Sequence, residues 1–304
     1  MAHEQLPKNR ALAVRQFKDN YTGYVFILPW LIGFLLLTLW PMAQSFYLSF
    51  TDYDLFSSPQ WIGTQNYISL FTKDKLFTAS LTRTFKYVLM VVPLKLVFSL
   101  LVAMLLNRSL KGMGIYRTAI YLPSLIGSSI AVSVLWRNIF GLEGYINSLL
   151  SIFGISPQGW LVNPRIAMNT LIILAVWQFG STMIIFLGGL KQIPMELYES
   201  SSIDGAGPVR RFTHITLPML SPTIFFDLIL GIIQAFQQFN SAFIVTKGGP
   251  AQSTYLYSLV LYEKAFRDYR MGYASGMAWI LLAIIALLTA ANFFISKFWV
   301  YYDE

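Results

Sequence analysis

Few side chains in this 304-residue sequence are suited to covalent chemistry. Cysteine is absent, and the two histidines, His3 and His214, stand far apart, which argues against disulfides, thiolate nucleophiles and a metal site. The glycines at 112–114 and 188–189 lack the lysine that a phosphate-binding loop requires. A membrane enzyme would need a cluster of histidines or a pair of carboxylates, and the sequence offers no plausible one. We therefore predict a protein with no catalytic site, no metal and no cofactor of its own.

Binding chemistry is possible in two apolar stretches that hold neutral polar residues. In one of them, residues 219–245, the side chains of Gln234, Gln238 and Ser241 follow i, i+4, i+7 spacing and share one face of a helix. Amides and hydroxyls beside aromatic rings suit a sugar, whose hydroxyls need donors and acceptors. Polar residues in membrane helices can instead simply join helices to one another. The candidate pathway residues are Gln178, Thr182, Gln234, Phe236, Gln237, Gln238, Asn240 and Ser241, with Asn169 and Ser181 nearby.

Two charged residues, Lys95 and Asp227, interrupt apolar stretches. At 1.5 Å per residue they lie about 16 Å and about 14 Å from the ends of their predicted helices, so their depths nearly match. Unpaired charge inside a membrane is costly. We expect the two side chains either to pair or share a water-filled cavity, or to find backbone carbonyls or water separately.

Composition indicates the elements that must position these residues. The sequence is 56% hydrophobic and only 12% charged, which is typical of a polytopic membrane protein. We predict an all-α fold with one membrane domain, residues 21–304, after a polar arm, residues 1–20. Six apolar stretches are long enough to span a bilayer: 24–46, 85–106, 119–136, 166–190, 219–245 and 272–296.

The net charge of +8 has two interpretations, nucleic-acid binding and membrane orientation. No basic folded module supports the first. The arm and the short loop 107–118, which carries Arg108, Lys111 and Arg117 without an acid, favour the second. Both termini are therefore expected in the cytosol.

Residues 195–222 form the main polar interruption between apolar stretches. Good helix formers follow Pro194, Asp204-Gly205 supplies a turn with positive φ, and Pro208 can begin a second short helix. This pattern predicts a helix-turn-helix. Its expected apolar underside consists of Leu197, Ile203, Phe212 and Ile215, and the side chains expected to face water or a partner are Glu199, Asp204, Arg210 and Arg211.

This segment resembles the EAA motif in the membrane subunits of bacterial ATP-binding-cassette (ABC) importers, which reads Glu-Ala-Ala, three residues, Gly. Here Glu199-Ser200-Ser201 and Gly205 are followed by Phe212, Ile215, Leu217-Pro218 and Pro222. Two serines replace two alanines, a small change in volume. Shorter matches to the maltose-type class, from about residue 24 onward, include Trp177, Gly180, Gly248-Gly249-Pro250, Gly272-Tyr273-Ala274-Ser275 and the closing Phe298-Trp299-Val300-Tyr301-Tyr302.

The resemblance implies that residues 194–218, here called the coupling segment, seat in a groove of a cytosolic ATPase subunit. Glu199 would meet a basic group there, although an acid in the first turn of a helix is also favoured by the helix dipole alone. The coupling residues so implied are Glu199, Ser200, Ser201, Asp204, Gly205, Ala206, Arg210, Arg211 and Phe212.

The resemblance also implies a function and partners. The chain would be a non-enzymatic permease subunit in the bacterial cytoplasmic (inner) membrane, importing a di- or oligosaccharide or a related glycoside. Expected partners are a second, different permease, two ATPase subunits that bind ATP and Mg, an extracytoplasmic binding protein and membrane lipid, with no nucleic acid. Glycerol phosphate or an acidic oligosaccharide is the alternative cargo, and a stand-alone secondary carrier is the alternative class. One further loop is charged, and we expect it either to contact the binding protein or to be simply solvated. Its charged residues are Glu263, Lys264, Arg267, Asp268 and Arg270.

Overall fold

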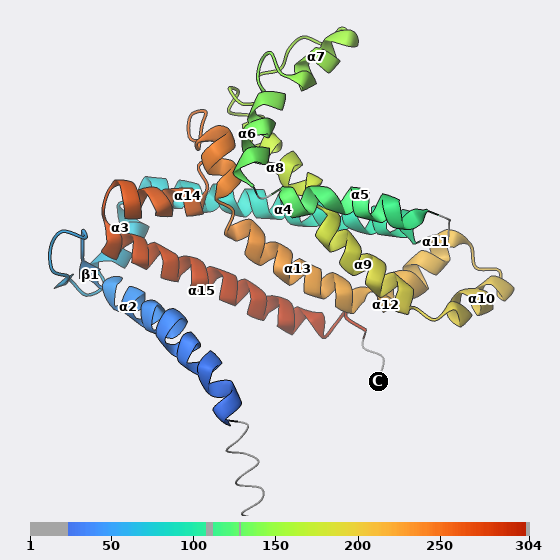
Figure 1. Ribbon diagram of the computed structural model, residues 1–304, viewed down its shortest axis with the longest axis horizontal. Helices are drawn as coiled ribbons and strands as arrows, with labels where there is room; N and C mark the ends of the chain where they lie inside the picture. The colour runs from blue at the N-terminus through green and yellow to red at the C-terminus, as the bar shows by residue number, and fades with distance from the viewer. Residues whose placement is uncertain (1–23, 108–111, 128, 302–304) are drawn as a thin grey trace, which may run out of the picture.

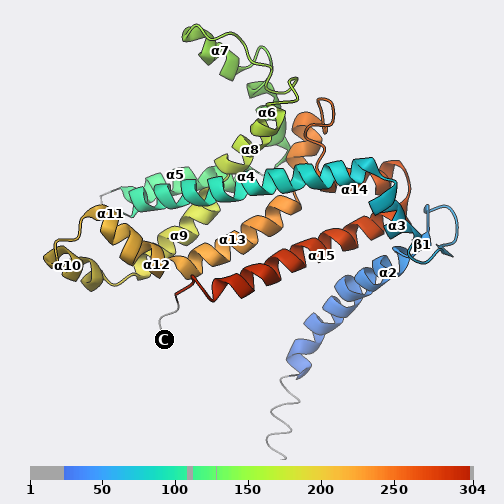
Figure 2. The same ribbon diagram turned by 180° about the vertical axis from the view of Figure 1, so that it is seen from behind.

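The computed structural model describes residues 24–107, 112–127 and 129–301. It is an elongated helix bundle built along α4 (Lys75–Leu106), with α13 (Ser221–Phe236) and α15 (Met271–Ser296) running beside it (Figures 1 and 2). A two-residue antiparallel ladder, β1 (Thr51–Asp52) with β2 (Gln60–Trp61), lies at one end. The coupling segment lies at the opposite end. The predicted arm 1–20 and the basic residues Arg108 and Lys111 fall outside the described residues.

Three helices in the described part of the chain are long and apolar enough to cross a membrane: Tyr24–Leu48, Lys75–Leu106 and Met271–Ser296. Three further pairs of helices meet this test together but are bent, and the count reaches six if each pair makes one crossing. The bent pairs are Met113–Ile126 with Ile130–Ile139 at 99°, Ala167–Trp177 with Gly180–Gln192 at 44°, and Pro208–Met219 with Ser221–Phe236 at 65°. The predicted all-α membrane fold is confirmed.

The predicted third, fourth and fifth spans are each bent pairs of helices. The third breaks after α5 (Met113–Ile126), where Pro123 and Gly127 precede Ser129, whose hydroxyl caps α6 (Ile130–Ile139) by accepting from the Val132 N–H. The fourth breaks between α8 (Ala167–Trp177) and α9 (Gly180–Gln192). In the fifth span, the regular helix α13 ends at Phe236 and does not continue to residue 245. The π-helical turn η3 (Ala242–Thr246) follows it.

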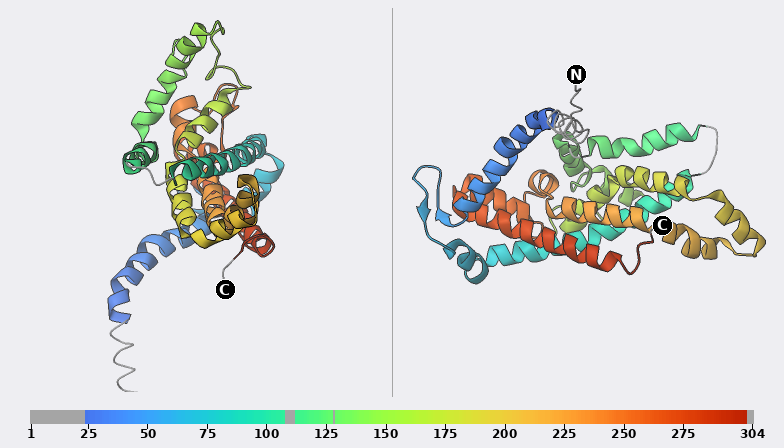
Figure 3. Two further views of the ribbon diagram at one scale, coloured as in Figure 1. Left: turned by 90° about the vertical axis from the view of Figure 1, so that its right-hand side faces the viewer. Right: turned by 90° about the horizontal axis from the view of Figure 1, so that it is seen from below.

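The remaining elements connect these spans. The first span continues through η1 (Leu35–Leu39) and α2 (Trp40–Leu48), and α3 (Gln65–Thr72) leads into α4. Helices α6 and α7 (Tyr145–Ile152) project sideways from the bundle, whereas the first span splays away in another direction (Figure 3). The other elements are α10 (Met195–Ile203), α11 (Pro208–Arg211), η2 (Phe212–Thr216), α12 (Leu217–Met219), α14 (Tyr257–Tyr262) and η4 (Glu263–Arg267).

Helix α4 is the common partner of two buried apolar clusters. Near the β1 end, Tyr87 of α4 packs in one cluster with residues of α8, α13, α14 and α15, and Tyr257 donates its N–H to the Thr84 hydroxyl at 2.9 Å. Toward the coupling segment, Ala103 of α4 packs with Met183 and Phe186 of α9. The exterior is apolar, as expected beside lipid, and none of the first span's most apolar stretch is buried.

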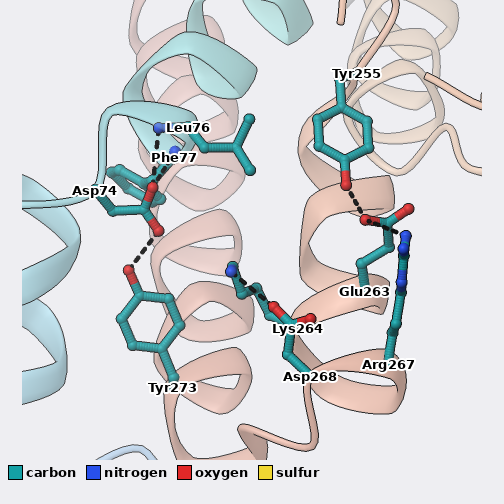
Figure 4. A network of polar contacts seen from close by, with 9 residues as sticks. All are labelled: Asp74, Leu76, Phe77, Tyr255, Glu263, Lys264, Arg267, Asp268 and Tyr273. Atoms are coloured by element: carbon teal, nitrogen blue, oxygen red, sulfur yellow. Dashed lines mark hydrogen bonds and ion pairs between the residues drawn. The ribbon is translucent and has the colours of Figure 1, made fainter. Parts of the chain in front are cut away.

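Asp74 fixes the start of α4 and joins it to α15 (Figure 4). Its carboxylate accepts the N–H groups of Leu76 and Phe77 at 2.9 and 3.0 Å and the Tyr273 hydroxyl at 2.7 Å. Partial burial works to raise the pKa of Asp74, but these three hydrogen bonds outweigh it and hold the pKa below its ordinary value of 3.8. The carboxylate is therefore both a helix cap and a tie between two spans.

Replacing Asp74 should destabilise this end of the bundle. Asp74→Ala removes the cap and the Tyr273 acceptor, for an expected loss of about 1–2 kcal/mol in unfolding free energy. Asp74→Asn keeps a capping oxygen and should lose less. Because the folded pKa is depressed, the stabilisation is complete above the unfolded value and disappears as pH falls through the folded value. Thermal unfolding in nanodiscs at several pH values tests this, and equal melting temperatures for wild type and Asp74→Ala at neutral pH would contradict it.

Candidate coupling segment and membrane cavity

The coupling segment is two short helical arms joined at a glycine. Helix α10 ends at Ile203, and Gly205 follows with φ of +74°, in the left-handed region predicted for it. The Gly205 and Ala206 N–H groups donate back to the carbonyls of Ser202 and Ser201. Pro208 then begins α11 as predicted. A glycine closes α10 because an L side chain opposes this φ.

Two side-chain contacts hold the arms in place. The Tyr198 hydroxyl of α10 and the Thr216 hydroxyl of η2 lie 2.9 Å apart in a hydrogen bond. Arg211 Nε donates to the Ala206 carbonyl at 2.7 Å across the turn. Arg211 is therefore a brace across the turn, and its side chain stays partly exposed; its contact with a partner stays a prediction.

The predicted apolar underside was wrong at two positions. Ile203 is 88% exposed and Leu197 39% exposed, whereas Phe212 and Ile215 are half-buried. The tip of the segment extends beyond the bundle (Figure 1), so no core lies beneath it to bury an apolar face. Of the other predicted residues, Ser201 and Ala206 are half-buried, and those on the surface are Glu199, Ser200, Asp204 and Arg210.

Exposed apolar residues on this tip were not anticipated from the sequence. Met195 is 68% and Val209 77% exposed, and with Ile203 they lie among the charged residues of the same segment. Large apolar side chains exposed on a protruding polar segment make it a candidate contact surface. The missed signal was that both helices are too short and too polar to bury their own apolar residues.

Inside the bundle, the polar residues of three spans face one cavity of about 90 Å³. That volume holds several water molecules. An adjoining cavity of about 270 Å³ continues between α9 and α13 and is lined in part by Ser124 and Ser181. The polar residues that line both cavities are Lys95, Gln178, Thr182, Asp227 and Gln234, and Gln238 lines the first.

Lys95 and Asp227 therefore face the same space. Asp227 is only 4% exposed, and its Oδ2 has no hydrogen-bond partner among the described residues. Within that part of the chain no ion pair of 4.0 Å or less joins the two side chains. Of the arrangements considered from the sequence, the geometry is that of a shared cavity without a direct pair.

The remaining pathway candidates are dispersed. Phe236 is buried in the core, edge-on to Phe85 with ring centroids 5.0 Å apart. It was expected to line the pathway, but it does not line the cavity. Ser241 is buried and accepts a hydrogen bond from Gln238 Nε2. The exposed residues outside the cavity are Asn169, Gln237 and Asn240. Gln234 and Gln238 face the same cavity as the spacing predicted, but α13 ends at Phe236, so the helical face does not extend to Ser241.

Gln178 has a structural partner as well as a place in the cavity. Its Nε2 donates to the Gly127 carbonyl at 3.1 Å, where the third span breaks. A side chain at position 127 would collide with Gln178, since an added Cβ would lie 2.3 Å from its Cγ. This amide therefore joins two broken spans, which is the role that the alternative interpretation of polar membrane residues assigned to it.

The charged residues at the β1 end mostly engage one another (Figure 4). Lys264 pairs with Asp268 at 2.8 Å and Arg267 with Glu263 at 3.6 Å, both one helical turn apart. The Tyr255 hydroxyl also donates to Glu263. The Arg267 side chain is 74% exposed, so it stays open to a partner.

Comparison with known proteins identifies the family. A family model described as "Binding-protein-dependent transport system inner membrane component" matches residues 72–300. The chain belongs to this family. The probable ABC transporter permease protein YesP of Bacillus subtilis is 53% identical over 290 residues, covering 94% of each chain. The lactose transport system permease protein LacF of Rhizobium radiobacter is 32% identical over 286 residues, covering 91% of this permease and 95% of LacF.

Solved structures agree at the level of fold. Two crystal structures of a bacterial alginate ABC transporter, one in complex with an alginate pentasaccharide-bound periplasmic protein, each match with a TM-score of 0.81. The first is 23% identical and covers 94% of this permease and 98% of the matched chain. The chain is thus a multi-pass permease of an ABC importer, as the resemblance of its motifs predicted, and the alternative of a stand-alone carrier is set aside.

Substitution of Gly205 should impair transport without preventing folding. A β-branched side chain at φ of +74° costs about 1–2 kcal/mol, although no atom lies within 4 Å to obstruct it. We expect Gly205→Val to lower uptake by the assembled importer at least tenfold at normal membrane levels, and Gly205→Asn to lower it less. Gly207→Ala is the matched control, because Gly207 has φ of −69° and equally open space. Normal uptake by Gly205→Val would refute the assignment.

Proposed function

We propose that this permease forms, with a second and different permease, the path for a di- or oligosaccharide or a related glycoside. The observation that carries the proposal is the cavity, in which the amides of Gln178, Gln234 and Gln238 and the Thr182 hydroxyl face one space. Such groups can donate to and accept from sugar hydroxyls. The lactose permease relative supports a sugar cargo.

The mixed lining of the cavity favours a neutral cargo over glycerol phosphate or an acidic oligosaccharide. Lys95 and Asp227 place one basic and one acidic side chain on the same wall. Where both are ionised, an anionic cargo is attracted by the first and repelled by the second. A hydroxylated neutral molecule can hydrogen-bond to both, which also relieves the unpartnered Asp227 oxygen.

We further propose that the coupling segment docks on ATPase subunits, which bind ATP and Mg, and that the permease has no ATPase site of its own. Met195, Ile203 and Val209 would form the apolar centre of the contact, with Glu199 and Arg210 at its polar rim. The coupling segment and both termini would then lie in the cytosol.

The β1 end would then face the outside and receive a substrate-binding protein. Support comes from the family description and from the alginate transporter solved with its periplasmic protein. The exposed Arg267 and its neighbours in η4 are the candidate contact. Residues 21–304 would act as one membrane domain.

Gln238→Leu tests the cavity. We expect the apparent KM for uptake to rise about threefold to tenfold, the loss of one or two hydrogen bonds, with basal ATP hydrolysis unchanged. Gln237→Leu is the matched control, since Gln237 is exposed outside the cavity. Cargo is identified first by testing which of several neutral disaccharides, glycerol phosphate and a uronic-acid disaccharide raises ATP turnover. Equal kinetics for both variants would contradict the proposal, and stimulation by the anionic compounds alone would overturn the choice of a neutral cargo.

A further inference from the structure

The last described residues of the chain lie where the coupling segment leaves and re-enters the bundle. The Tyr301 N–H donates to the Ser221 hydroxyl at 2.8 Å, 80 residues away in sequence. Tyr301 also lines a cavity of about 230 Å³ with Ile193, the last residue before Pro194 and the coupling segment, and with Met219 and Pro222, just after that segment. One short stretch of chain therefore bonds to one root of the coupling segment and faces the other across this cavity.

Ser221 lies at a bend where the backbone lacks one helical hydrogen bond. The chain bends by 65° between Pro208–Met219 and Ser221–Phe236. In a regular helix the Pro218 carbonyl would accept the N–H of residue 222, but that residue is proline and has none. The Ser221 hydroxyl donates to the Pro218 carbonyl instead, at 2.6 Å. The same hydroxyl oxygen accepts from Tyr301, so a single side chain joins the bend to residues 298–301.

Residues 298–301, here called the tail, are themselves anchored. The Val300 N–H donates to the Ser296 carbonyl at 2.8 Å, which continues the end of α15. The Trp299 ring meets Phe225 of α13 edge-on, with centroids 6.2 Å apart, and Phe225 in turn packs against Phe293 of α15 at 5.0 Å. Ser221 is 97% buried within this junction, so a lost hydrogen-bond partner there is costly.

We propose that the tail is a positioning element for the coupling segment. Through the chain Tyr301 N–H, Ser221 hydroxyl and Pro218 carbonyl, it sets the angle at which η2 and α12 meet α13. The importance of this positioning for transport rests on the proposed docking of the coupling segment to an ATPase. The positioning itself does not depend on that docking. The tail thereby ties the sixth span to the segment that precedes the fifth.

The test measures how firmly the coupling segment is positioned relative to α4. The chain has no cysteine, so spin labels at Ser202→Cys on α10 and Thr78→Cys near the start of α4, both exposed sites, report one distance by electron paramagnetic resonance in the assembled importer. Ser221→Ala removes the hydroxyl, and Tyr301→Pro removes the N–H. Each should at least double the width of the distance distribution.

Two variants separate positioning from general stability. Ser221→Thr keeps the hydroxyl, and Tyr301→Phe keeps the N–H while removing only the ring hydroxyl, so both should preserve the wild-type distribution. An unchanged distribution in Ser221→Ala and Tyr301→Pro overturns the inference, whatever the coupling segment contacts. Equal broadening in Ser221→Thr and Tyr301→Phe also overturns it. If the distribution broadens as expected and uptake stays normal, the positioning stands and the proposed docking function fails.

Discussion

Backbone hydrogen bonding inside lipid is the constraint on which this structure depends. A broken span leaves carbonyl and N–H groups that lipid cannot satisfy, so side chains or enclosed water must satisfy them. Gln178 donates to the Gly127 carbonyl at the break between α5 and α6. At the break between α8 and α9, Ser99 donates to the Phe179 carbonyl, and Ser124 accepts the Ser181 N–H. Each break is thereby fastened to a neighbouring helix, and the unbroken α4 is the strut against which several of them pack.

The same breaks explain why the cavity lies where it does. Gln178 and Thr182 flank the gap between α8 and α9, and Gln238 follows the end of α13, so regular helix packing stops around one interior space. Gln178 satisfies a backbone carbonyl there, and under the proposed function the polar groups of the cavity would also serve a cargo. A glutamine can therefore be both a structural tie and a binding group, and the two interpretations of such residues do not exclude each other.

The sequence was sufficient for features that depend on local chemistry. Apolar length predicted the membrane class, Gly205 predicted its own positive φ, and Pro208 predicted the start of α11. It was insufficient where tertiary packing decides. Apolar length alone did not locate the breaks near Gly127 and Gln178, because hydrogen bonds between helices stabilise those breaks. Phe236 was placed beside polar neighbours by spacing, yet its ring lies in the core, since the helix ends there.

The coupling segment shows how a lever can be stiff at its root and open at its tip. At the root, Tyr198 bonds to Thr216 and Ser221 to Pro218, and burial near Leu220 keeps water from competing. At the tip, Ile203 is 88% exposed, and few contacts with the bundle hold it. Under the proposed docking, a partner that covers the tip would move the root with it, because the hydrogen bonds at the root hold the two arms to the bundle. Force applied to the tip would then pass to α13, which carries Gln234 near its far end and is followed by Gln238.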